Sequence, residues 1–187
     1  MKKALFLLLA AIVSLLALAA CGDTTPPETT VPTTVATEPQ ISIEDYKSLA
    51  LENLDELYNN AVIVNKAASY IAKYWNSAES INATITTQKL LDACNKYLEE
   101  NSITTLADME AAFDASADLY KAVYFAHIEG AEADAIKEAF DAFYNAYIGF
   151  YNLTMNPTGD RKAFNESANN YIAEIQNSVS KLDLLLE

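Results

Sequence analysis

The sequence is poor in the residues on which many phosphate-binding and metal sites depend. It has four glycines and one histidine among its 187 residues. Loops that cradle phosphate need several glycines close together, and no such loop is present. A di-iron site in a helix bundle needs two Glu-x-x-His pairs, but the residue three before His127 is Tyr124. We therefore expect neither a nucleotide-binding loop nor a metal centre.

The motifs of covalent catalysis and haem attachment are also missing. There is no Gly-x-Ser-x-Gly elbow and no Cys-x-x-Cys-His sequence. Cys94 and His127 fall in separate expected helices, and nothing in the pattern brings them together. We expect no enzyme activity and no cofactor. His127 is interpreted as a hydrogen-bonded residue near the end of the third helix, with a single axial haem ligand as the alternative.

Positive charge is scarce, with 12 Lys and Arg against 26 Asp and Glu, a net charge of −14. Such a surface repels nucleic acid phosphates, so we expect no nucleic acid partner. Two acidic rows stand at close to four-residue spacing, namely Glu110, Asp114 and Asp118, and Asp134, Glu138 and Asp141. Like charges at that spacing slightly destabilise a helix. We interpret the rows as a solvated face, with a metal or basic-partner site as the alternative, although no EF-hand loop is present.

The N-terminus has the pattern of an export signal. Lys2 and Lys3 precede an apolar stretch from Ala4 to Ala20, and small residues lead to Cys21. The segment Leu18 to Cys21 resembles the lipobox of bacterial lipoprotein precursors. The resemblance implies cleavage before Cys21, a diacylglyceryl group on its thiol, and an anchor on the extracytoplasmic face of the cell membrane. Two acyl chains are enough to hold a protein stably on a membrane. The alternatives are an ordinary secretory signal or an uncleaved membrane helix at the short limit of length.

Cleavage at this point changes the charge and the thiol count. Loss of Lys2 and Lys3 leaves 10 basic residues against 26 acidic ones, a net charge of −16. Because lipid occupies Cys21, Cys94 is the single remaining thiol, and an intramolecular disulfide is impossible. Leucines flank Cys94 on an apolar helical face, which indicates a buried structural thiol. A reactive or cross-linking thiol is the alternative.

The segment from residue 21 to 40 is predicted to be a disordered linker. After Cys21 it carries seven Thr and four of the five prolines. Proline fixes extended backbone, and the other residues have little to bury. At about 3.1 Å per residue the linker reaches roughly 60 Å from the membrane.

Residues 41–187 have the composition and periodicity of long helices. No proline occurs between Ile41 and Asn156. Ser42 with Asp45, and Thr105 with Asp108, have the spacing of helix-capping pairs. Two heptad rows follow in the first helix, Ala50, Leu57, Val64 and Ile71, and Leu54, Ala61, Ala68 and Trp75. Such rows predict packing against other long helices.

The rest of the domain divides into helices at residues that favour helix ends and helix starts. A short helix is expected over 89–100, Gly130 suits the C-terminus of the third helix, and Asn156 to Gly159 separates the fourth from a last helix capped by Asp160. With no strand pattern, the sequence predicts an all-α domain, an antiparallel four- or five-helix bundle. Trp75-Asn76 and the Asn156 to Gly159 turn resemble those of uncharacterised helical lipoproteins of Gram-positive bacteria, which implies a helical fold and a surface location but no activity.

Aromatic residues are concentrated in the third and fourth helices. The candidate ligand-binding residues are Tyr120, Tyr124, Tyr144, Tyr147 and Tyr151. The aromatic side chains of these helices spread over more than one helical face, so those outside the core stripe can line a groove for a ligand or a partner helix. A wide core that contacts three neighbours is the alternative.

Three functions fit this sequence. The first is a lipid-anchored binding or interaction module that engages a surface protein, a peptide or a wall component. The second is a small-molecule binder with an apolar cleft among the third, fourth and last helices. The third is a signalling peptide released from the signal sequence.

Overall fold

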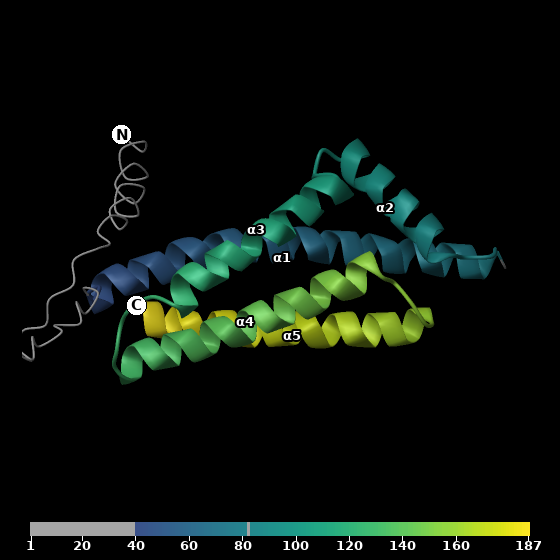
Figure 1. The fold of residues 1–187 in the computed structure, drawn as a ribbon. Coiled ribbons are helices and arrows are strands. Elements are labelled where there is room, and N and C mark those ends of the chain that lie inside the picture. The colour runs from purple at the N-terminus through teal and green to yellow at the C-terminus, as the bar shows by residue number, and fades with distance from the viewer. Residues whose placement is uncertain (1–39, 82) are drawn as a thin grey trace, which may run out of the picture. The chain divides into compact units, whose positions relative to one another are not determined.

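A computed structural model describes residues 40–81 and 83–187, and in that part of the chain every regular element is a helix. The helices are α1 (Ile43–Ser80), α2 (Thr87–Glu100), α3 (Leu106–Tyr124), α4 (Ala131–Met155) and α5 (Arg161–Leu186) (Figure 1). The all-α prediction is therefore confirmed. The predicted signal peptide, Cys21 and the linker up to residue 39 lie outside the described residues. Among the described helices, none combines the length and the hydropathy required to cross a membrane.

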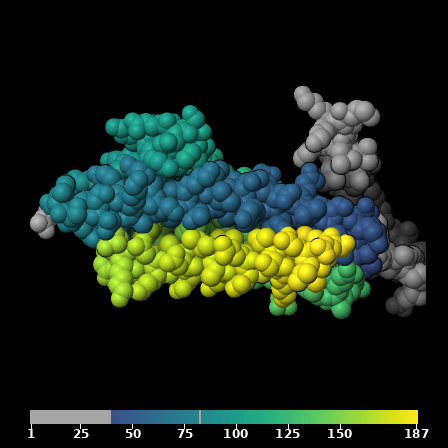
Figure 2. Space-filling model, turned by 180° about the vertical axis from the view of Figure 1, so that it is seen from behind, coloured from purple at the N-terminus to yellow at the C-terminus, as the bar shows by residue number. Residues whose placement is uncertain are grey.

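The long first helix is the centre of the bundle. It contacts each of the other four helices, while α4 and α5 form the most extensive helix pair. Figure 1 shows α4 and α5 as an antiparallel hairpin, with α3 crossing over α1, and α3 contacts both α1 and α4. Figure 2 shows α1 lying between α5 on one side and α2 on the other. Because α2 packs chiefly on α1, its outer flanks remain open.

The heptad rows of α1 form its buried face, as predicted. Leu57, Val64 and Ile71 have no exposed surface, and the second row is buried along its full length. The aromatic side chains of α4 cover this face from the other side, with Phe140 and Phe143 fully buried. Each such side chain contributes about 1.5–3 kcal/mol relative to an exposed one. Apolar burial along α1 therefore holds the bundle together.

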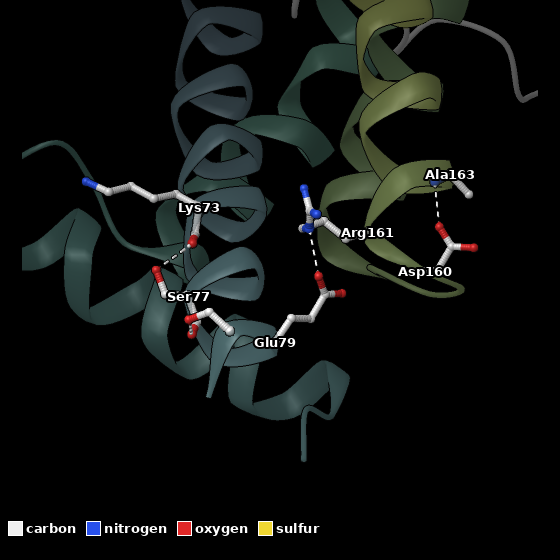
Figure 3. Close-up of polar contacts among 7 residues, drawn as sticks. Lys73, Ser77, Glu79, Asp160, Arg161 and Ala163 are labelled. Carbon is white, nitrogen blue, oxygen red and sulfur yellow. Dashed lines mark hydrogen bonds and ion pairs between the residues drawn. The ribbon is translucent and has the colours of Figure 1, made fainter. Parts of the chain in front are cut away.

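Side-chain caps start the helices where the sequence indicates. The amide of Asp45 donates to Ser42 Oγ at 3.1 Å, and Ser42 Oγ donates to the Asp45 carboxylate at 2.8 Å. Thr105 and Asp108 repeat the arrangement. The amide of Ala163 donates to the Asp160 carboxylate at 2.8 Å (Figure 3). Each cap satisfies an amide that the first helical turn leaves unpaired.

The prediction for the end of the third helix was wrong. Helix α3 ends at Tyr124, and Gly130 is the N-cap of α4, with φ of 127°, a conformation that favours glycine. His127 is exposed in the connection, where its backbone carbonyl accepts a hydrogen bond from the amide of Ile41 at 3.2 Å. His127 is therefore outside α3 and in contact with the start of the domain.

Candidate functional site

The five tyrosines predicted to bind a ligand lie along the contact between α3 and α4. The ring of Tyr120 stacks on that of Tyr144 with centroids 4.3 Å apart, and Tyr124 lies 5.2 Å from Tyr120. Tyr144 is 6.4 Å from Tyr147, and Tyr151 stacks on Phe113 at 3.8 Å, with Phe113 also 6.0 Å from Tyr147. The structure thus places them in one continuous aromatic row.

The faces of these rings are largely occupied by other rings. Tyr147 has no exposed surface, and Tyr144 and Tyr151 are only 8% and 6% exposed, whereas Tyr124 is 36% exposed. Stacking of this kind stabilises the pairs by about 0.5–1.5 kcal/mol each. A ligand that entered the row would have to separate rings that already contact one another.

The hydroxyl groups of the row have different surroundings. Tyr120 Oη donates to Asp141 Oδ1 at 2.7 Å, and burial together with this carboxylate raises the pKa of Tyr120. Tyr144 Oη and Ser116 Oγ are 3.3 Å apart. Tyr147 Oη is buried and neither donates nor accepts a hydrogen bond within the described residues. Burial raises the pKa of Tyr147 as well, and nearby Tyr151 and Tyr144 add to the increase.

Cys94 is buried on α2, as predicted. Its thiol faces the backbone carbonyl of Ala67 on α1 at 3.7 Å, and burial raises its pKa to about 11. At neutral pH the side chain is therefore a protonated thiol with low nucleophilicity. Across residues 40–81 and 83–187, no group of three or more His, Cys, Asp and Glu side chains is arranged to hold a metal ion.

A second aromatic cluster, which the sequence did not indicate, joins α1 to α2. The rings of Tyr70 and Tyr97 stack at a centroid distance of 4.1 Å and an interplanar angle of 9°, and Tyr74 lies 6.4 Å from Tyr70. All three side chains are half-buried. The Tyr70–Tyr97 pair lies on the open flank of α2 and separates two hollows.

The larger hollow, the α1–α2 cleft, has a volume of about 620 Å³. Tyr70 and Tyr74 line it from α1, and Lys89, Asp92 and Lys96 line it from α2. Lys89 Nζ donates to the carbonyl of Thr84 at 3.1 Å. The cleft therefore combines aromatic walls with charges of both signs.

The smaller hollow, the lysine pocket, has a volume of about 240 Å³ and lies beside the cleft. Its lining residues are Asn65, Lys66, Ser69, Tyr70, Lys73 and Tyr97. Tyr70 lines both hollows. Figure 3 shows the side chain of Lys73 extending away from Glu79 and from Arg161 of α5, which pair with each other at 2.9 Å.

The charge around the lysine pocket differs from that of the rest of the chain. Between Glu56 and Glu79 helix α1 contains no acidic residue, although the chain has 26. At physiological salt, charges more than about 8 Å apart are largely screened. Lys66 and Lys73 therefore make the α1 side of the pocket positive, while from α2 the carboxylate of Glu100 acts on Tyr70.

Sequence reasoning missed this region because its parts are distant in the chain. The spacing of Lys66 and Lys73 and the acid-free run of α1 are visible in the sequence. The third part, Tyr97, reaches Tyr70 only through the docking of α2 on α1. Comparisons with protein families, with curated proteins and with solved structures found no match for this chain.

Proposed function

We propose that this chain is a lipoprotein, anchored to the extracytoplasmic face of the cell membrane through lipid on Cys21. Support comes from the basic start, the apolar stretch and the segment Leu18 to Cys21. The linker after Cys21 holds the helical domain away from the membrane surface. A domain with this net negative charge is repelled by anionic headgroups, which agrees with a tethered position.

We further propose that the helical domain is a binding or interaction module for a wall or surface component. One observation carries this proposal, the α1–α2 cleft beside the Tyr70–Tyr97 pair. Its volume of about 620 Å³ is in the range of about 300–1,000 Å³ usual for ligand pockets. Aromatic walls give contact area, and Lys89, Asp92 and Lys96 give the cleft charged groups of both signs.

The anchor is tested with the two cysteines as matched variants. The full chain is expressed in a Gram-positive host that is fed a palmitate analogue suitable for labelling. Cys21→Ser is expected to abolish the label and release the protein, whereas Cys94→Ser keeps both the label and the membrane fraction. Label that persists in Cys21→Ser would refute the anchor, because the thiol is the site of acylation.

The binding site is tested by cross-linking on intact cells. A photoreactive phenylalanine replaces Tyr74, which lines the cleft, or Lys162, an exposed control position on α5 outside it. A cross-linked product specific to position 74, identified by mass spectrometry, is expected. Equal products at both positions, or none at position 74, would count against the cleft as the site.

A further inference from the structure

The lysine pocket is lined by two basic side chains, Lys66 and Lys73, that have no ion-pair or carbonyl partner within the described residues. Among the ten Lys and Arg residues of the described segments, six form ion pairs with carboxylates. Two more, Lys89 and Lys137, donate to backbone carbonyls. Lys66 and Lys73 have neither kind of partner within these segments, and both line the same pocket. Unused positive charge is thus concentrated at one place.

Their spacing suits a single anionic group. Lys66 and Lys73 are seven residues apart on α1, which places their Cα atoms about 10 Å apart on one helix face. Ser69 lies between them in the sequence and lines the same pocket. Two flexible ammonium groups can therefore close on one anion from both sides, with a hydroxyl donor between them.

We propose that the lysine pocket binds a phosphate group, and that the rest of the ligand lies across Tyr70 in the α1–α2 cleft. This inference rests on the proposed binding function and names the chemistry of its ligand. Lysine is a common point-charge partner of phosphate, and two ammonium groups match the charge of about −1.5 to −2 on a phosphate monoester at neutral pH better than the single charge of a carboxylate.

The pocket's size and the charge of the whole chain restrict the ligand further. A volume of about 240 Å³ accommodates one anionic group of a ligand rather than a whole ligand of usual size. A long polyanion would extend beyond the two lysines toward carboxylates such as Asp92 and Glu100 of the adjoining cleft, which repel it. The geometry therefore favours a phosphate monoester, either free or at the end of a wall polymer.

The test uses the mature lipidated protein in non-ionic detergent and follows its amide NMR signals. The probes are inorganic phosphate, glycerol 3-phosphate, glycerol, and glycerate as a carboxylate of similar size. Phosphate and glycerol 3-phosphate are expected to shift signals of residues 65–73 and Tyr97, with binding that weakens as salt is raised. Glycerol alone is expected to leave the lysine pocket unchanged.

Charge-matched variants separate a local site from a general effect of charge. Lys66→Gln with Lys73→Gln is expected to weaken binding of glycerol 3-phosphate at least about tenfold, since each exposed charge contact contributes a few-fold. Lys162→Gln with Lys181→Gln removes the same charge from α5 and should leave binding unchanged. Glutamine preserves helix propensity, so all four substitutions are compatible with folding.

The outcomes distinguish the phosphate site from the wider binding function. Glycerate that binds as tightly as glycerol 3-phosphate would overturn the phosphate assignment. Phosphate probes that shift no signal at residues 65–73 would overturn the lysine pocket as a site, even if cross-linking at position 74 succeeds. Failure of both experiments would refute the proposed function together with this inference. If the phosphate probes do bind at the lysine pocket, a wall polymer and a free ester are distinguished by whether end-phosphorylated wall fragments bind more tightly than glycerol 3-phosphate.

Discussion

The hydroxyl of Tyr147 offers a sharp test of how the core between α3 and α4 is built. Its side chain has no exposed surface, and its oxygen has no hydrogen-bond partner within the described residues. Ser116 is nearby, but its hydroxyl donates to the carbonyl of Phe113 at 2.5 Å and faces Tyr144 Oη at 3.3 Å. Tyr147→Phe removes the oxygen and retains the ring that packs against Phe113.

The expected gain follows from the cost of burying a polar atom without a partner. A buried hydroxyl that lacks a hydrogen bond costs about 1–3 kcal/mol. Loss of one oxygen leaves a small void, which offsets part of that gain. We expect Tyr147→Phe to raise the free energy of unfolding by about 1 kcal/mol, which raises Tm by roughly 2–4 °C for a chain of this length.

Tyr120→Phe is the matched control because its hydroxyl does have a partner. Tyr120 Oη donates to Asp141 at 2.7 Å, and the loss of this bond is expected to lower the free energy of unfolding by about 1 kcal/mol. Both variants are measured by urea unfolding of the full-length protein, followed by far-ultraviolet circular dichroism. If Tyr147→Phe destabilises the protein as much as Tyr120→Phe does, the Tyr147 hydroxyl has a partner and the reasoning fails.

Three further predictions follow from other parts of the core. Burial and the nearby Asp134 raise the pKa of Tyr46 to about 12. The unfolded chain therefore loses the Tyr46 proton at a lower pH than the folded protein does. The free energy of unfolding should keep its full value below about pH 10 and fall as the pH rises toward 12. A urea midpoint that is constant over this range would contradict the prediction. Cys94 should react with a thiol reagent at neutral pH far more slowly in the folded protein than in the urea-unfolded chain, because the domain must open first, and equal rates in the two states would contradict its burial. A Cβ at Gly149 would lie 2.3 Å from the ring of Tyr171, so Gly149→Ala should destabilise by about 1–2 kcal/mol despite better helix propensity. In a Tyr171→Ala background the same change should stabilise the protein, as thermal unfolding of the four variants can measure.

Local chemistry explains why the helix starts and the core rows could be predicted from the sequence. Ser42, Thr105 and Asp160 satisfy amides within three residues of themselves, so their role does not depend on distant contacts. The heptad rows of α1 are likewise a property of one helix, because residues seven apart share a face whatever packs against it.

The end of α3 could not be predicted because distant contacts decide it. Glycine at position 130 is compatible both with a helix end and with the start of the next helix. The connection is fixed by the amide of Ile41 on the carbonyl of His127, and by Lys137 Nζ on the carbonyls of Ala126 and Ile128. These contacts hold residues 125–130 outside both helices.

The sequence by itself determined that the chain is mostly helical from Ile43 onward, which faces of α1 and α4 are apolar, and that Ser42, Thr105 and Asp160 cap helices. Tertiary structure alone decided which aromatic side chains became core and which border open hollows. The tyrosines of α3 and α4 stack on each other, whereas Tyr70 meets Tyr97 across 27 residues at the open flank of α2. Helical periodicity fixes the direction of a side chain on its own helix, but the docking of helices determines what lies opposite it.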